Sequence, residues 1–526
     1  MRIRRVSGRG VASVAVAGVL FSAAACATGG GVGGGGGGFV LPDGSPAPIC
    51  TAGVYPPAPG PEPTRTPPTV VTDLPSDLQL ETPGFGVPAS STLAIASTVS
   101  EDNSKLLFFA EGQSVVPGGF IGDAALVLRD RTTGTNTLIA SQTDRNTSFH
   151  PRPSRFGPTG NVVFAEHGYW LPLPPDERLD GPFDHYQTQV FEWDVDTHDF
   201  TVLSLGVDGK PIASVPLGVH PQPDDPAPTW GPRNPNLSAD GRYVFFTTNV
   251  RVDPAETQPP FTETKDLFRR DTVTGEIIQV NVGNYDEYGI NANRGRSGVE
   301  KYDVSDDGRY VVFKTLAVGA LAETGMCGQA DLLFFRDIQA ETTTLVSHDN
   351  LGKQRFAGGT EFMSADGRYV IWESSDPGMP NLPAGTDMIW DRLTGQNDWF
   401  LPEQDGTPAG HSENDHSYTG DFPMSVTPDM HKMLIVVTDD GPFSDGVIPG
   451  DGDGNHEVVL FDRSANTVRR VSQLPDGTSV STIFDELVTM AWATLSPDGS
   501  RLFFVTSAAL LPGDTYPGRA LYSMAL

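Results

Sequence analysis

Short apolar runs, each placed directly after a Ser-x-Asp-Gly sequence, recur along the chain. The four clearest copies read LSADGRYVFF, VSDDGRYVVF, MSADGRYVIW and LSPDGSRLFF, at residues 237–246, 304–313, 363–372 and 495–504. Weaker copies begin at Val99, Phe156 and Val426, which makes seven. Such self-similarity indicates a repeat architecture in which each copy is one supersecondary unit.

Each copy predicts a hairpin. Asp-Gly is a strong hairpin signal because glycine accepts the positive φ that primed turns require. The Ser or Thr two residues earlier can hydrogen-bond backbone N–H groups of the same turn. The residues that follow are β-branched and aromatic and form a continuous apolar run, which predicts a strand covered on both faces.

A second motif follows most copies and reads strand, Asp-containing turn, strand. It begins at Ala125, Val190, Asp266, Asp331, Met388 and Glu457. Each repeat thus supplies four antiparallel strands, A to D, with A–B and C–D as tight hairpins. Four-stranded sheets repeated radially form a β-propeller. The sequence therefore predicts an all-β, seven-bladed β-propeller of four-stranded antiparallel blades over residues 69–526.

The seventh repeat lacks a strand. After residues 495–504 only ALYSMAL, residues 520–526, remains as strand-forming sequence. The segment TVVTDL, residues 69–74, has the size and composition of the missing D strand. We therefore expect an N-terminal strand to close the ring, which removes the exposed edges of an open array.

The S-x-D-G-R-Y-V-x-F, P-G-D and D-R-x-T-G phrases resemble the TolB-like, WD-repeat-like propellers of bacterial exported proteins. The resemblance covers residues 69–526 and implies the fold. It implies little about activity, because propellers carry many unrelated functions.

The N-terminus has the pattern of an export signal. Four arginines without any acidic residue precede an apolar run over residues 11–25. This predicts a signal peptide at residues 1–25, because the run is too short for a transmembrane helix. The Ala23-Ala24-Ala25-Cys26 sequence resembles a lipobox, in which Cys26 is lipidated. Ordinary cleavage there, which would give a secreted protein, is the alternative.

Residues 26–68 are rich in Gly and Pro, which predicts a disordered tether. We therefore expect an exported protein that is lipid-anchored in the cell envelope. The tether contains Cys50, which either pairs with Cys327 in the oxidising environment outside the cytoplasm or stays free.

The charge balance argues against some classes of binding partner. The chain has 35 Lys and Arg against 66 Asp and Glu, a net charge of −31. This argues against nucleic acid and against electrostatic binding to anionic lipid. We expect membrane contact only through the lipid, and a partner that is an envelope protein or glycan.

The hairpin pattern also predicts a binding face. The long segments all join strands B and C or lead from D to the next A, so they belong to one face of the ring. Loops on a rigid scaffold often carry binding sites. Candidate binding residues in these segments are Trp170, Tyr186, Trp230, Tyr285, His411, His416 and Tyr418. The alternatives are insertions without function and rings that only pack the loops onto the disc.

Catalytic and metal motifs are sparse. HSENDH, residues 411–416, could ligate a metal or be a solvated polar loop. In residues 449–457, PGDGDGNHE, the oxygens of Asp451, Asp453 and Asn455 could converge on Ca²⁺, and an acidic turn is the alternative. The function expected is a non-catalytic binding or scaffold propeller tethered to the envelope. A propeller hydrolase or lyase with its active site at the channel mouth is the alternative.

The calcium hypothesis is testable by stability. A ligand that binds only the folded state stabilises it in proportion to the logarithm of its concentration over Kd. Millimolar Ca²⁺ should therefore raise the melting temperature, and Asp453→Ala should abolish the rise. A melting temperature that does not respond to Ca²⁺ would mean that the segment is only a turn.

Overall fold

The computed structural model describes residues 64–81, 93–111, 116–117, 124–142, 152–167, 188–212, 232–250, 252, 261–282, 299, 301–315, 331–349, 355–374, 382, 386–402, 406, 408, 422–437, 457–477, 493–506, 510–511 and 520–526. All structural statements below concern these residues. Within these ranges no helix is both long and apolar enough to cross a membrane.

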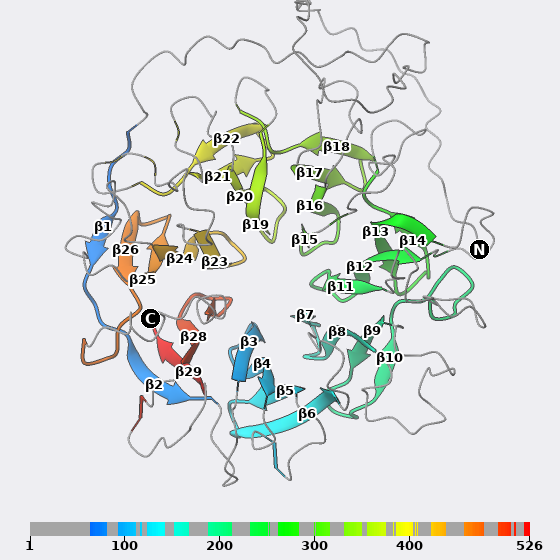
Figure 1. Cartoon of the computed structure of the whole chain (residues 1–526), viewed down its shortest axis with the longest axis horizontal. Helices are drawn as coiled ribbons and strands as arrows, with labels where there is room; N and C mark the ends of the chain where they lie inside the picture. Colours follow the sequence, from blue (N-terminus) through cyan, green and yellow to red (C-terminus); the bar gives the residue numbers. More distant parts are fainter. Residues whose placement is uncertain are drawn as a thin grey trace, which may run out of the picture.

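Seven sheets surround a central axis (Figure 1). Blade 1 contains β3 (Leu93–Val99), β4 (Lys105–Glu111), β5 (Ala124–Asp130) and β6 (Thr135–Gln142). Blade 2 contains β7 (Arg152–Phe156), β8 (Val162–His167), β9 (Thr188–Trp193) and β10 (Phe200–Val202). Blade 3 contains β11 (Arg233–Leu237), β12 (Tyr243–Val250), β13 (Phe261–Asp271) and β14 (Ile277–Gln279).

The same order continues around the ring. Blade 4 contains β15 (Lys301–Val304), β16 (Tyr310–Thr315), β17 (Leu332–Asp337) and β18 (Thr342–Leu345). Blade 5 contains β19 (Ala357–Met363), β20 (Tyr369–Ser374), β21 (Thr386–Asp391) and β22 (Gln396–Trp399). Blade 6 contains β23 (Phe422–Val426), β24 (Lys432–Val437), β25 (Glu457–Asp462) and β26 (Thr467–Arg470). Blade 7 has β27 (Thr494–Leu495), β28 (Arg501–Thr506) and β29 (Ala520–Ala525).

The predicted seven-bladed propeller of four-stranded antiparallel blades is confirmed. Strand A lies innermost and strand D outermost in each blade, and β12, β16 and β20 carry the apolar runs seen in the sequence. All six residues of β16 are buried, as expected for a strand that is covered on both faces. The core is therefore a ring of clusters between neighbouring blades, such as the one that joins Phe245 to Phe313.

An N-terminal strand closes the ring, as expected, but it is not the segment assigned from the sequence. The missing outer strand of blade 7 is β2 (Ser76–Leu80), which pairs antiparallel with β29. Part of residues 69–74 forms β1 (Thr69–Val71), which pairs parallel with β26 as a fifth strand of blade 6. The sequence assignment was wrong because two short strand-forming segments lie close together and only non-local pairing distinguishes them.

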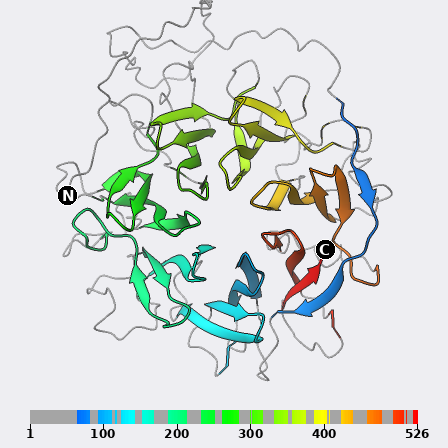
Figure 2. The same cartoon turned by 180° about the vertical axis from the view of Figure 1, so that it is seen from behind.

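Residues 64–81, which we call the strap, run along the outside of four blades (Figure 2). At blade 5, the backbone N–H of Arg65 donates to the Gly406 carbonyl at 2.7 Å. The strap then adds β1 to blade 6 and β2 to blade 7. Its last residue, Glu81, reaches blade 1.

Glu81 links the two ends of the ring. Its side chain is only 2% exposed. Arg129 and Arg131 of blade 1 each donate through Nε to one Glu81 carboxylate oxygen at 2.9 Å. From blade 7, Ser523 Oγ donates at 2.6 Å, and the Glu81 backbone N–H donates to the Leu521 carbonyl at 2.8 Å. A buried carboxylate is stable only when it is paired and hydrogen-bonded in this way.

The Ser-x-Asp-Gly turns differ from the primed turns expected. In blade 3 the Gly241 N–H donates to the Ser238 carbonyl, and Gly241 has φ +70° while Asp240 does not have a positive φ. This corresponds to a turn of type I followed by one left-handed residue, which is the second common hairpin solution. Ser238 Oγ donates to Asp240 at 2.6 Å and accepts from the Tyr243 N–H at 2.9 Å, as the Ser was expected to do.

The same turns join neighbouring blades. The Ala239 N–H donates to the Asp306 carbonyl, Asp306 to Ala365, and Ala365 to Pro428, each at 2.8 Å. Glycine is also required by close approach here, because a Cβ at Gly308 would lie 2.6 Å from the Tyr243 ring of the preceding blade. One repeated turn sequence therefore closes the hairpin and fixes the junction.

Removal of the strap should weaken the ring. Deletion of residues 64–81 should greatly lower the melting temperature, and deletion of residues 27–60 should not. Glu81→Ala leaves the buried Arg129 and the partly buried Arg131 without their carboxylate, so the free energy of unfolding should fall by about 3–5 kcal/mol. Chemical denaturation would measure this, with the exposed Glu101→Ala of blade 1 as the control. Equal effects of the two substitutions would contradict the closure by Glu81.

Candidate functional site

The residues that the sequence nominated lie outside the described residues and remain predictions. This holds for the expected lipidation site, for the calcium ligands, for the binding-face residues and for the two remaining cysteines. They are Cys26, Asp451, Asp453, Asn455, Trp170, Tyr186, Trp230, Tyr285, His411, His416, Tyr418, Cys50 and Cys327. Within the described ranges, no group of three or more His, Cys, Asp or Glu side chains could hold a metal ion.

The strands that flank the long segments do share one face. In blade 2, for example, His167 at the end of β8 pairs with Thr188 at the start of β9, at the end opposite the turn that joins β7 to β8. The antiparallel order is the same in the other blades. The strand ends that lead into the long segments therefore lie opposite the Ser-x-Asp-Gly turns.

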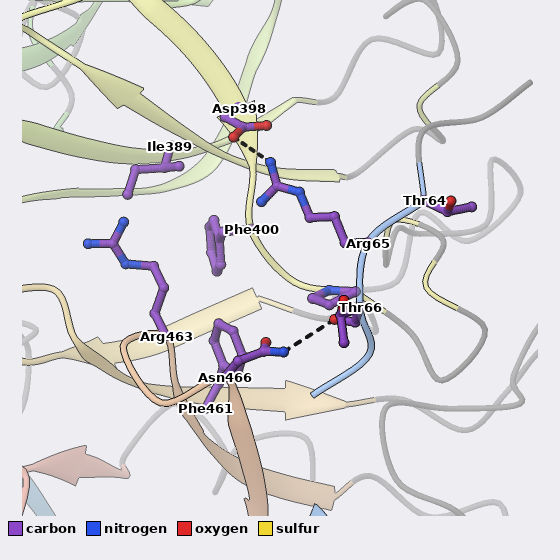
Figure 3. A pocket seen from close by; sticks show the side chains of 10 residues that line it. Thr64, Arg65, Thr66, Ile389, Asp398, Phe400, Phe461, Arg463 and Asn466 are labelled. Carbon is purple, nitrogen blue, oxygen red and sulfur yellow. Dashed lines mark hydrogen bonds and ion pairs between the residues drawn. The ribbon is translucent and has the colours of Figure 1, made fainter. Parts of the chain in front are cut away.

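A cavity lies between blades 5 and 6, beside the strap (Figure 3). Its volume is about 570 Å³. It takes residues from the strap, from the outer strands of blade 5 and from the β25–β26 hairpin of blade 6. The lining residues are Thr64, Arg65, Thr66, Ile389, Asp398, Phe400, Pro402, Phe461, Arg463 and Asn466.

The floor of the cavity is apolar. Phe400 follows β22, and Phe461 lies on β25. Their ring centroids are 6.5 Å apart, and the rings are stacked with an angle of 21° between their planes. Ile389 on β21 belongs to the same buried cluster. The floor therefore continues the core of the junction outward.

The rim of the cavity is polar and is held by the strap. The Arg65 guanidinium forms an ion pair with Asp398 and lies 4.4 Å from the centre of the Trp399 ring. Asn466 Nδ2 donates to the Thr66 and Pro67 carbonyls, both at 3.3 Å. These contacts fix one wall of the cavity to blades 5 and 6.

Arg463 supplies the second cation. Its Nε donates to the Met430 carbonyl at 3.1 Å, and its guanidinium lies 4.9 Å from the centre of the Tyr369 ring. Arg463 is the Arg of an Asp-Arg pair in the second motif, so the sequence contained this residue but no signal of its role. Arg65, Asp398 and Phe400 were missed because only the register of the outer strands brings them together.

Carboxylates in the repeated turns carry the clearest electrostatic signal. Arg242 donates to Asp271 through Nε at 3.1 Å and Nη2 at 2.7 Å, and these bonds, with two backbone N–H groups, lower the pKa of Asp271 to about 2. Hydrogen bonds from Ser100 and Ser104 lower the pKa of Asp102 to about 2. These groups stabilise the turns and are not poised for proton transfer near neutral pH.

Comparison with known proteins gives similarity at the level of solved structures. No protein-family model matches the chain, and no curated protein does. Oligogalacturonate lyase from Vibrio parahaemolyticus is 12% identical over 89% of this chain and 98% of its own, with a TM-score of 0.47. TolB from Acinetobacter baumannii is 11% identical over 70% of this chain and 63% of its own, with a TM-score of 0.35.

The Cps50 (Swd1) β-propeller domain from Myceliophteria thermophila is 10% identical over 86% of this chain and 100% of its own, with a TM-score of 0.39. These values carry no inference about the activity of this chain.

The turn carboxylates predict how stability depends on pH. A carboxyl whose pKa is lowered in the folded state contributes fully above its unfolded pKa, and that contribution is lost as the pH falls through the folded pKa. For Asp271 the loss falls between about pH 4 and pH 2. Asp271→Asn should lower the free energy of unfolding at pH 6 and make its decline below pH 4 shallower. The exposed Asp196→Asn serves as control, and the same pH profile for Asp271→Asn and wild type would refute the assignment.

Proposed function

We propose that the protein is an exported, envelope-tethered propeller that binds a protein or a glycan without catalysis, through the face from which its long segments leave. The observation that supports this most is the position of the strand ends. In every blade where both ends are described, the connections outside the tight hairpins leave from the same end of the sheet. A rigid disc with its variable segments gathered on one face is suited to recognition.

The strap supports the tethered arrangement. It attaches the N-terminal part of the described chain to blades 5, 6 and 7 and to Arg129 and Arg131 of blade 1. The residues that precede the strap are therefore joined to the ring through contacts with four blades. This suits a domain held at a membrane by lipidated Cys26 and the Gly- and Pro-rich residues that precede the strap.

The net charge of −31 limits the charge that a partner can have. An acidic surface favours basic or neutral partners and disfavours acidic ones. The association rate should therefore fall as the salt concentration rises when the partner is basic. The aromatic residues in the long segments, such as Trp170 and Trp230, are of the type that anchors protein and sugar ligands.

The test compares capture from envelope extracts by the wild type and by a variant with residues 213–231 and 409–421 shortened. These limits spare residues 206–212, which hydrogen-bond into blade 2 and pack against its core. The wild type should capture partners that the shortened variant loses. Val273→Ser with Leu393→Ser, on exposed hairpin tips at the opposite face, is the matched control and should retain them.

A Cys26→Ser variant tests the anchor, because this substitution should move the protein from the membrane fraction to the soluble or secreted fraction.

In the capture experiment, identical partners for the wild type and the shortened variant would contradict recognition by the loop face. Turnover of a hydrolase or lyase substrate that is abolished by single changes such as His411→Ala would replace the binding function with an enzymatic one.

A further inference from the structure

The arginine that follows the turn aspartate of strand C recurs at three blade junctions. It is Arg131 in blade 1, Arg392 in blade 5 and Arg463 in blade 6. Each donates to a carbonyl of the A–B turn of its own blade, at 2.7, 2.9 and 3.1 Å respectively. Each guanidinium also lies over an aromatic ring of the preceding blade, on Phe503, Tyr310 or Tyr369. The three junctions can therefore be compared position by position.

At the junction of blades 7 and 1, this arginine binds a carboxylate. Arg131 Nε donates to Glu81 Oε1 at 2.9 Å while its other contacts hold it in place. The protein thus contains its own example of a carboxylate bound at this position. That carboxylate belongs to the strap.

The register shows what replaces Glu81 at the junction of blades 5 and 6. Ser523 pairs with Phe503 and Gln79, and Ile389 pairs with Ile371 and Asp398. Two residues beyond Gln79 is Glu81, and two residues beyond Asp398 is Phe400. Phe400 therefore occupies the position of Glu81.

The residues around Phe400 are also apolar where the residues around Glu81 are polar. Phe461 precedes Asp462 as Arg129 precedes Asp130, and Ile389 stands where Ser523 stands. The polar cluster of one junction has thus become the apolar floor of a cavity at the other. Arg463 still occupies the position of Arg131.

The charges of this cavity favour an anion at short range. Two guanidinium groups, Arg65 and Arg463, line it against one carboxylate, Asp398. The field of the whole chain, with its net charge of −31, opposes anions. That field is screened at physiological salt, and direct guanidinium–carboxylate hydrogen bonds are not.

We propose that this cavity is a binding site for a small amphipathic carboxylate. The carboxylate is bound by the Arg463 guanidinium, with Arg65 as the second cation, and the apolar body of the ligand rests on Phe400 and Phe461. A simple anion would make no use of the apolar floor, and an uncharged apolar ligand would make no hydrogen bond to the Arg463 guanidinium. Because Arg65 and Thr66 belong to the strap, the ligand contacts both the strap and the blades. Arg65 lies on the strap and Arg463 in a tight hairpin, not in the long segments, so this proposal does not rest on the proposed function.

The experiment uses the full mature chain and phenylacetate as the probe, measured by calorimetry or by ligand-observed NMR. Phenylacetate is smaller than the cavity and represents a fragment of the full ligand, so a Kd in the millimolar range is expected. Phenylacetamide lacks the charge and acetate lacks the ring. Phenylacetamide should bind at least about tenfold more weakly than phenylacetate, since a hydrogen bond to a charged group is worth about a tenfold change in affinity or more. Acetate should also bind more weakly, because it lacks the apolar surface that the ring would bury on Phe400 and Phe461.

The variants compare equivalent arginines. Arg463→Gln should weaken phenylacetate binding by about tenfold. Arg392→Gln removes the same stacked arginine one junction earlier, and because Arg392 does not line this cavity, the substitution should leave the affinity unchanged. Arg65→Gln, at the exposed end of the strap, keeps the test valid if Arg463→Gln does not fold, and should also weaken binding.

Four results would overturn the proposal. These are no saturable binding of phenylacetate, equal binding of phenylacetamide, equal binding of acetate, and the same change in affinity for Arg463→Gln and Arg392→Gln. None of them bears on capture by the long-segment face, so the two proposals fail separately.

Discussion

The propeller depends on one non-local contact set, the docking of the strap. Blade 7 supplies three strands from the C-terminal part of the chain, and β2 supplies the fourth. Without Glu81, blades 7 and 1 would be joined by packing and by side-chain hydrogen bonds such as that from Asn103 Nδ2 to Asp498 at 3.1 Å. Glu81 adds a buried carboxylate that accepts from Arg129 and Arg131 on one side and from Ser523 on the other. Because breaking such a cluster leaves buried charges unpaired, the ring resists opening at this junction.

The junctions share an arrangement of the backbone but differ in their side chains. The A–B turns are linked by backbone hydrogen bonds from blade 3 to blade 6, which does not depend on side chains beyond the turn itself. At three junctions the outer half contains an arginine stacked on a ring, and the residues around that arginine differ. At blades 7 and 1 this half holds an ion cluster that closes the fold, and at blades 5 and 6 it forms a cavity. Repetition thus provides the frame, and single positions such as Glu81 and Phe400 decide what each junction does.

Local signals were sufficient to predict the blades and not the closure. Ser-Ala-Asp-Gly followed by Tyr243 and an apolar run marks a hairpin because turn and strand preferences act within about ten residues. The strap was misplaced because Thr69–Val71 and Ser76–Leu80 are both short and their partners lie about 400 residues away. Glu81 carries no local signal, and the cavity at Arg463 follows from register across two blades. The predicted metal and binding-face residues lie outside the described ranges, so they remain predictions.

The most direct test of the strap as part of the propeller is native-state hydrogen exchange of the wild-type protein. If the strap is an integral strand, backbone amides of β2 and of β29 should exchange through a common opening, with the same free energy and the same dependence on denaturant. If β2 is only a peripheral attachment, its amides should exchange at a much lower free energy while those of β29 stay protected. That second result would contradict closure of the ring by the N-terminal strap.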